Sequence, residues 1–133
     1  MHAEVKNPKF AVLGAGHGGL AMAGHLAVMG FEVSLYNRSE QRLWGVSARG
    51  GIDLEGEVEG FGRIPVITTS IEEALDGAEL IMVVVPATGH RFIAEQCAPY
   101  LKEGQTVILH PGRTLGALEF RQTLIEKGCA ADV

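Results

Sequence analysis

Three glycines that follow a short apolar run near the start of the chain have the spacing of a phosphate-binding turn. Gly14, Gly16 and Gly19 match G-x-G-x-x-G, the pattern that wraps backbone around a dinucleotide pyrophosphate. The first glycine permits a tight turn, the second lets backbone approach the phosphates, and the third lets the helix pack close to the sheet. The helix that begins here offers unpaired N–H groups and a partial positive charge to an anion. We therefore expect Gly14, Gly16, His17, Gly18 and Gly19 to bind the cofactor, His17 through its backbone N–H.

The end of the second predicted strand bears on which nicotinamide cofactor is preferred. Sites specific for NAD commonly carry an Asp or Glu about twenty residues past the glycines, where it binds the ribose 2′-hydroxyl. This chain has Asn37-Arg38-Ser39 there, without a carboxylate to repel a 2′-phosphate, and the planar fork of Arg38 could pair with that phosphate. An ordinary surface turn is the alternative. We predict that Asn37 and Arg38 contact the cofactor and that NADP is preferred over NAD, with Arg42 as a further candidate phosphate contact.

A second loop is expected at the same edge of the sheet, after an apolar strand. Ligands of open α/β sheets bind at the carboxyl ends of the strands. Val85, Pro86 and Ala87 are therefore predicted to line the cofactor near its nicotinamide half, and His90 is predicted to touch cofactor or substrate rather than to act as a general base.

A third loop, His110–Thr114, follows the next strand. We expect Pro111 to shape a turn beside the nicotinamide, while Arg113 is either a contact for a substrate carboxylate or a surface arginine. No Ser-His-Asp order, paired-carboxylate site or metal-ligand spacing stands out in the chain, so we predict neither a catalytic residue nor a metal site in it.

The hydrophobic pattern alternates between short apolar runs and longer amphipathic segments, which indicates an α/β fold. We predict a Rossmann-type, doubly wound parallel sheet with helices on both faces. The predicted strands are Phe10–Leu13, Glu32–Tyr36, Val66–Thr68, Leu80–Val85 and Thr106–His110, and the predicted helices are Gly18–Met29, Glu40–Ala48, Ser70–Leu75, Arg91–Leu101 and Gly116–Glu126. Ser70-Ile-Glu-Glu73 has the pattern of a capping box, and Gly50–Gly62 the pattern of an irregular hairpin.

Length and composition favour one soluble domain over residues 1–133. Apolar residues make up 47% and charged residues 20%, which is ordinary for a globular protein, and the net charge of −5 argues against nucleic-acid binding. Neither a run of about eighteen apolar residues nor a secretory signal is present, so we expect no membrane span. Cys97 and Cys129 match no metal or redox spacing, which favours reduced thiols and a cytoplasmic location. A homo-oligomer is compatible with the sequence.

The last residues, Ala130–Val133, have the composition of the start of another strand. A doubly wound domain of this kind has about six strands. We therefore expect the sheet to be truncated near the sixth strand.

With these segments placed, the chain resembles the amino-terminal domain of the opine (octopine/nopaline) dehydrogenase family. The resemblance rests on Val12–Gly19, Val33–Ser39, Ile81–Ala87 with His90, and Leu109–Phe120. The last segment is the most specific, because it is similar to the family's run Asn-Pro-Gly-x-x-Gly-Gly-Ala-Leu-Glu-Phe. Two positions depart from that run: His110 stands where the family usually has Asn, and Leu115 where it usually has Gly.

The resemblance implies an NAD(P)H-dependent oxidoreductase that condenses an amino acid with a 2-keto acid and reduces the resulting imine. Family members supply the catalytic histidine–acid pair and most of the substrate pocket from a helical carboxyl-terminal domain. That domain is outside this sequence, so its residues transfer to no position here. We therefore expect this chain alone to bind cofactor without catalysing turnover.

Two alternatives stay open. Glycerol-3-phosphate dehydrogenase and ketopantoate reductase share the domain plan, although the run Gly116–Phe120 favours the opine group. The second alternative is a stand-alone, non-catalytic nucleotide-binding module, which fits a chain of 133 residues.

Overall fold

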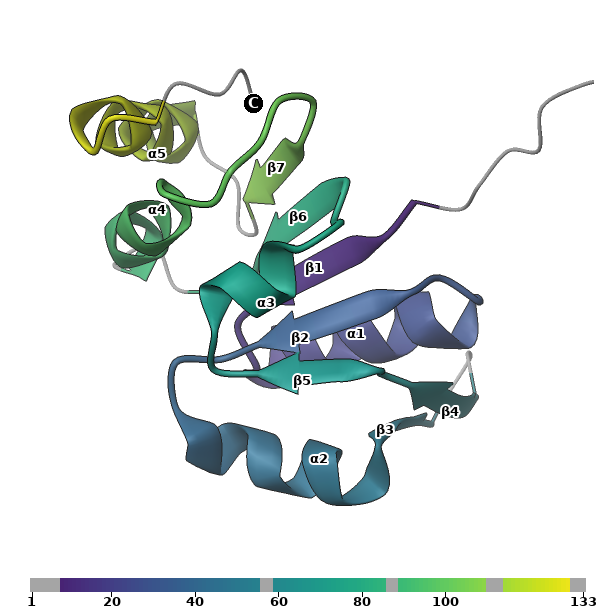
Figure 1. The fold of residues 1–133 in the computed structure, drawn as a ribbon. Helices are drawn as coiled ribbons and strands as arrows, with labels where there is room; N and C mark the ends of the chain where they lie inside the picture. The colour runs from purple at the N-terminus through teal and green to yellow at the C-terminus, as the bar shows by residue number, and fades with distance from the viewer. Residues whose placement is uncertain (1–7, 56–58, 86–88, 110–113, 130–133) are drawn as a thin grey trace, which may run out of the picture.

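A five-stranded parallel sheet organises the chain in the computed structural model, which describes residues 8–55, 59–85, 89–109 and 114–129 (Figure 1). The strand order is β5-β2-β1-β6-β7, and every pairing in this sheet is parallel. The strands are β1 (Phe10–Leu13), β2 (Val33–Tyr36), β5 (Val66–Thr68), β6 (Leu80–Val83) and β7 (Thr106–Leu109). The predicted doubly wound, Rossmann-type fold is thereby confirmed. The predicted start of a further strand at Ala130–Val133 lies outside the described residues.

Helices cover both faces of the sheet, as Figure 1 shows. One face carries α1 (His17–Val28), the 3-10 helix η1 (Glu40–Leu43) and α2 (Trp44–Arg49). The other face carries α3 (Ile71–Leu75), α4 (His90–Cys97) and α5 (Thr114–Glu126). None of the described helices is long and apolar enough to cross a membrane.

The central strand β1 separates two apolar cores. Its side chains alternate, so that Ala11 and Leu13 enter the core beneath α3, α4 and α5, while Phe10 and Val12 enter the core beneath α1. Ala11, Val12 and Leu13 are fully buried, as expected for a parallel strand that is covered on both faces.

An antiparallel hairpin packs against α1 on the outside of this sandwich. Its strands are β3 (Gly51–Leu54) and β4 (Gly60–Arg63), which confirms the hairpin expected over residues 50–62. Two glycines make the close approach possible: a Cβ at Gly24 would lie 2.9 Å from Cγ2 of Ile52, and one at Gly62 would lie 2.7 Å from Cβ of Ala27.

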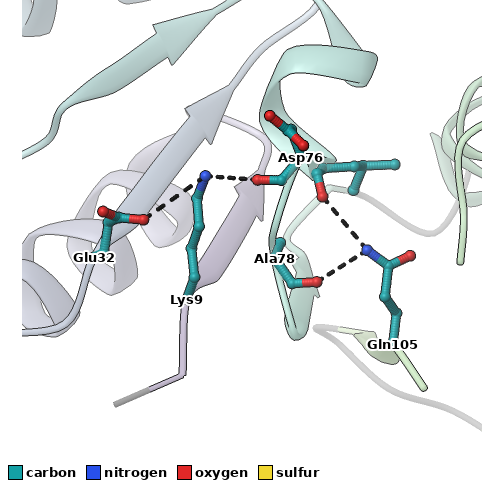
Figure 2. A network of polar contacts seen from close by, with 6 residues as sticks. Lys9, Glu32, Asp76, Ala78 and Gln105 are labelled. Atoms are coloured by element: carbon teal, nitrogen blue, oxygen red, sulfur yellow. Dashed lines mark hydrogen bonds and ion pairs between the residues drawn. The ribbon is translucent and has the colours of Figure 1, made fainter. Parts of the chain in front are cut away.

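Polar contacts at the amino edge of the sheet join the segments that precede the strands (Figure 2). Lys9, just before β1, donates from Nζ to the backbone oxygen of Asp76 at 2.6 Å and lies 3.8 Å from a carboxylate oxygen of Glu32. These contacts connect β1 to the end of α3 and to the residue before β2.

Gln105, which is only 7% exposed, extends the same network (Figure 2). Its Nε2 donates to the backbone oxygens of Ala78 at 2.9 Å and Leu75 at 3.4 Å, and its Oε1 accepts from the N–H of Lys102 at 2.7 Å. This buried amide has partners at both of its ends, and it satisfies backbone carbonyls at the end of α3 and just after it.

Two local predictions need correction. The helix predicted to run to Leu101 ends at Cys97, because the chain then turns and the N–H groups of Tyr100 and Leu101 both bond to the Cys97 oxygen. The strand predicted to reach Val85 ends at Val83.

The capping box before α3 is only half formed. Oγ of Ser70 accepts from the N–H of Glu73 at 3.3 Å, as predicted. The N–H of Ser70 donates to Oγ1 of Thr68 at 2.9 Å rather than to the Glu73 carboxylate, because the strand that precedes the helix supplies a nearer acceptor.

Candidate functional site

The carboxyl ends of β1, β2 and β6 lie side by side at the centre of the sheet. In the strand register Leu13 pairs with Tyr36 on one side and with Val83 on the other. The pairing continues for one step into the loops, since the N–H of Gly14 bonds to the Tyr36 oxygen at 2.8 Å and that of Val84 to the Leu13 oxygen at 2.9 Å. The strand order reverses here, between β1 and β6, which is where open α/β sheets bind ligands.

The glycine-rich turn between β1 and α1 requires glycine at two of its three predicted positions. Gly14 has φ +120°, and a Cβ there would overlap the backbone oxygen of Val84. A Cβ at Gly19 would overlap the backbone oxygen of Gly14, so the helix could not approach the strand. Gly16 differs, because a Cβ there would meet no described atom within 4 Å. The protein's own packing does not demand a glycine at Gly16, whereas a ligand lying against the turn would.

The amino end of α1 is a donor surface. The helix caps on Gly16, which has no side chain to accept from the first amides, and no acidic residue lies in the first turn. Its first intrahelical bond runs from the N–H of Leu20 to the Gly16 oxygen at 2.9 Å, so the preceding amides have no partner within the helix. His17 and Gly18 are both exposed here. This arrangement suits a phosphate group.

Asn37 at the end of β2 has a structural task that the sequence did not reveal. Its Oδ1 accepts from the N–H of Ala15 at 3.0 Å, and its Nδ2 donates to the backbone oxygen of Ser39 at 2.9 Å. The amide therefore joins the glycine-rich turn to the β2 loop.

Arg38 is exposed next to this junction, with its Cζ 4.3 Å from the centroid of the Phe92 ring of α4. Sequence reasoning missed Phe92, because only the folded chain brings the second residue of the β2 loop beside α4. Arg42 is exposed on η1, and its side chain has no hydrogen bond or ion pair with another described residue.

His90 opens α4 at the same edge and is only 3% exposed. Its Nε2 has no hydrogen-bond partner among the described residues. Val85 is half-buried nearby, between the turn and α4: its side chain would contact a Cβ at Gly14 and one at Gly89. Pro86, Ala87, Pro111 and Arg113 lie outside the described residues.

Burial raises the pKa of two side chains behind this edge, Tyr36 and Cys97. Burial raises the pKa of the Tyr36 phenol, with Cys97 adding to the effect and Arg38 opposing it. Burial, helped by Cys129, raises the pKa of the Cys97 thiol to about 12. Such a thiol is no activated nucleophile. In the described ranges no group of three or more His, Cys, Asp or Glu side chains is arranged to hold a metal ion.

The geometry agrees with what the chain resembles in sequence. Residues 9–127 match the family described as the NAD binding domain of 6-phosphogluconate dehydrogenase. An opine dehydrogenase of Arthrobacter sp. (strain 1C) is 42% identical over 125 residues, covering 93% of this chain and 35% of its own length. A glycerol-3-phosphate dehydrogenase [NAD(P)+] of Shouchella clausii (strain KSM-K16) is 34% identical over 107 residues, covering 75% of this chain and 29% of its own length.

A solved structure of octopine dehydrogenase with NADH and pyruvate superposes with a TM-score of 0.78 at 25% identity. The match covers 94% of this chain and 34% of that protein, so the chain spans about a third of the length of these relatives. The resemblance to the amino-terminal part of opine dehydrogenases is confirmed. With a glycine-rich turn at the switch point of its parallel sheet, the chain belongs to the family of NAD-binding domains described for 6-phosphogluconate dehydrogenase.

Proposed function

We propose that this chain is the cofactor-binding part of an opine-type oxidoreductase, which uses NAD(P)H to reduce the imine formed from an amino acid and a 2-keto acid. The observation that carries the cofactor site is the amino end of α1, where a Cβ at Gly16 would meet no described atom within 4 Å and no side chain caps the first amides. The opine reaction is favoured over the glycerol-3-phosphate dehydrogenase reaction by the higher identity to the Arthrobacter enzyme, 42% against 34%.

In this proposal the pyrophosphate lies against Gly14–Gly19, with the backbone N–H groups of Gly16, His17 and Gly18 as donors. The adenosine end lies over the β2 loop, where Arg38 is placed to pair with a 2′-phosphate and makes NADP the preferred cofactor. Asn37 acts indirectly, by fixing the turn through Ala15.

The nicotinamide half extends toward β6 and α4. Val85, Pro86, Ala87 and Pro111 would line it, and the unpartnered Nε2 of buried His90 is available to bond to cofactor or substrate. The bound nicotinamide supplies the hydride, while the chain binds and orients it. The amino acid and keto acid would be bound, and the acid–base chemistry supplied, by a part that corresponds to the remaining two thirds of the relatives' length, so the chain alone binds cofactor without turnover. We place the protein in the cytoplasm. A homo-oligomer is compatible with the proposal.

Thermal unfolding in the presence of NADPH and NADH tests the binding site. A ligand that binds only the folded state raises the melting temperature as its concentration exceeds its Kd. We expect both dinucleotides to stabilise the chain, NADPH at lower concentration. Gly16→Val should melt near the wild-type temperature without ligand, because a Cβ at this position meets no described atom, yet lose the stabilisation by both.

Gly45→Val on α2 is the matched control, since Gly45 is exposed and a Cβ there, like one at Gly16, meets nothing within 4 Å. This variant should keep its response to both dinucleotides. Stabilisation of Gly16→Val equal to wild type would remove the turn as the pyrophosphate site. If NADPH and NADH stabilise wild type equally, the proposed binding site stands and the preference for NADP is contradicted.

Assays of the protein expressed from its whole coding frame distinguish the two reactions. Oxidation of NADPH that requires both an amine and a 2-keto acid supports the opine reaction. Oxidation with dihydroxyacetone phosphate alone would assign the glycerol-3-phosphate reaction instead. Binding of dinucleotide without either activity would favour a non-catalytic module.

A further inference from the structure

We propose that Phe92 sets the cofactor preference of this site by holding the guanidinium of Arg38 in place for a 2′-phosphate. This inference rests on the proposed dinucleotide site and deepens it. The two residues come from different parts of the fold, Arg38 from the loop after β2 and Phe92 from α4, and they meet across the carboxyl edge with Cζ 4.3 Å from the ring centroid. At this distance a guanidinium is attracted to the aromatic face.

Packing against the core supports the Phe92 ring. Phe92 is half-buried and packs against the core beneath α4, which also contains Ile93, Ala94 and Cys97. Two ion pairs join α4 to the end of α5: Arg91 with Glu126 at 3.3 Å and Lys127 with Glu95 at 3.4 Å. α4 therefore presents the Phe92 ring from a fixed backbone.

Arg38 is held from the other side by its neighbour. Asn37 is bonded to Ala15 and to Ser39, which fixes the backbone from which the Arg38 side chain extends. Among the described residues the Arg38 side chain makes no ion pair or hydrogen bond, so the Phe92 ring is the group that it packs against. A long arginine side chain that would otherwise sample many rotamers is thus ordered before a ligand arrives.

A stacked guanidinium keeps its hydrogen-bonding capacity. The aromatic ring contacts the face of the group, whereas its five N–H donors lie in the plane and point outward. A 2′-phosphate can therefore pair with the edge of Arg38 while the stacking contact persists. The ribose 2′-hydroxyl of NADH offers no charge to this edge, so the ring should matter for NADPH and much less for NADH.

The test compares the Kd values of NADPH and NADH for wild type, Phe92→Leu and Phe92→Tyr. Phe92→Leu keeps apolar packing against α4 but removes the aromatic face. We expect this variant to raise the Kd of NADPH about two- to fivefold, which corresponds to the loss of one partly exposed cation–π contact. NADH binding should change less than twofold. Tyr retains the face and should restore the wild-type ratio of the two Kd values.

Phe61→Leu is the matched control, because Phe61 is an exposed aromatic on β4 of the hairpin, away from the carboxyl edge. It should leave both Kd values unchanged. In the Arg38→Ala background, Phe92→Leu should no longer alter the ratio, since the two residues act as one unit.

The possible failures are distinguishable. If wild type binds neither dinucleotide, the proposed function fails and this inference fails with it. If wild type binds both and Phe92→Leu leaves the ratio unchanged, or weakens NADH as much as NADPH, the site stands and the role of Phe92 is overturned.

Discussion

The backbone N–H of Ala15 donates a hydrogen bond of 3.0 Å to Oδ1 of Asn37. Ala15 belongs to the glycine-rich turn and is buried, so its N–H has no access to bulk water and depends on this side chain. One amide thereby couples the conformation of the phosphate-binding turn to that of the loop carrying Arg38.

Removal of this acceptor should destabilise the fold measurably. We expect Asn37→Ala to lower the free energy of unfolding by about 1–3 kcal/mol, because a buried donor loses its partner. Asn37→Asp keeps an oxygen at the same place and should lose less. Urea denaturation of the three proteins measures both changes, and equal losses in the two variants would show that the Ala15 contact is not the cause.

Gln105 should be important for stability at the opposite edge of the sheet. Gln105→Leu keeps the volume but leaves the Ala78 oxygen without its donor, which should cost about 1–3 kcal/mol. Gln122→Leu serves as the control, since Gln122 is exposed on α5 and should change the free energy of unfolding little. Similar urea midpoints for both variants would contradict the role assigned to the buried amide.

Gly19 should tolerate no side chain. A Cβ at this position overlaps the backbone oxygen of Gly14, and a backbone atom cannot move aside as a flexible side chain can. We expect Gly19→Ala to lose about 3 kcal/mol or more, or to fail to fold. Gly45→Ala, in an open position of α2, should be neutral or more stable by up to about 1 kcal/mol. A folded Gly19→Ala protein with wild-type stability would refute this packing.

Stability should fall as the pH rises above about 9. The Cys97 thiol titrates near 9.0 when exposed, and burial raises its pKa to about 12. Between these values the unfolded chain binds fewer protons than the folded chain, so the free energy of unfolding decreases with pH. The raised pKa of Tyr36 acts in the same direction at somewhat higher pH.

Cys97→Ala isolates the thiol contribution. The substitution should lower stability at pH 7 through lost packing, but its stability should decline less steeply between pH 9 and 11 than that of wild type. Cys129→Ala, at a half-buried position, should keep nearly the wild-type slope. Parallel pH profiles for wild type and Cys97→Ala would show that this thiol does not control the alkaline transition.

The parts of the fold that the sequence predicted are those with local causes. The positive φ of Gly14 and the overlap of a Cβ at Gly19 with the Gly14 oxygen arise within one turn of chain, and the fully apolar β6 indicates a central strand whatever its neighbours are. Contacts that depend on how distant elements are placed could not be anticipated. The stacking of Arg38 on Phe92 needs the position of α4 relative to β2, and the bond from the Ala15 N–H to Asn37 needs the end of β2 beside the glycine-rich turn.

The polar network of Lys9 and Gln105 lies at the amino edge of the sheet, whereas Arg38, Phe92 and the glycine-rich turn lie at the carboxyl edge. Substitutions at distant sites without shared partners have nearly additive effects on free energy. A protein engineer could therefore first stabilise the amino edge to raise the melting temperature, and then exchange residues at the carboxyl edge to change the cofactor preference. The two sets of substitutions should interfere little with each other.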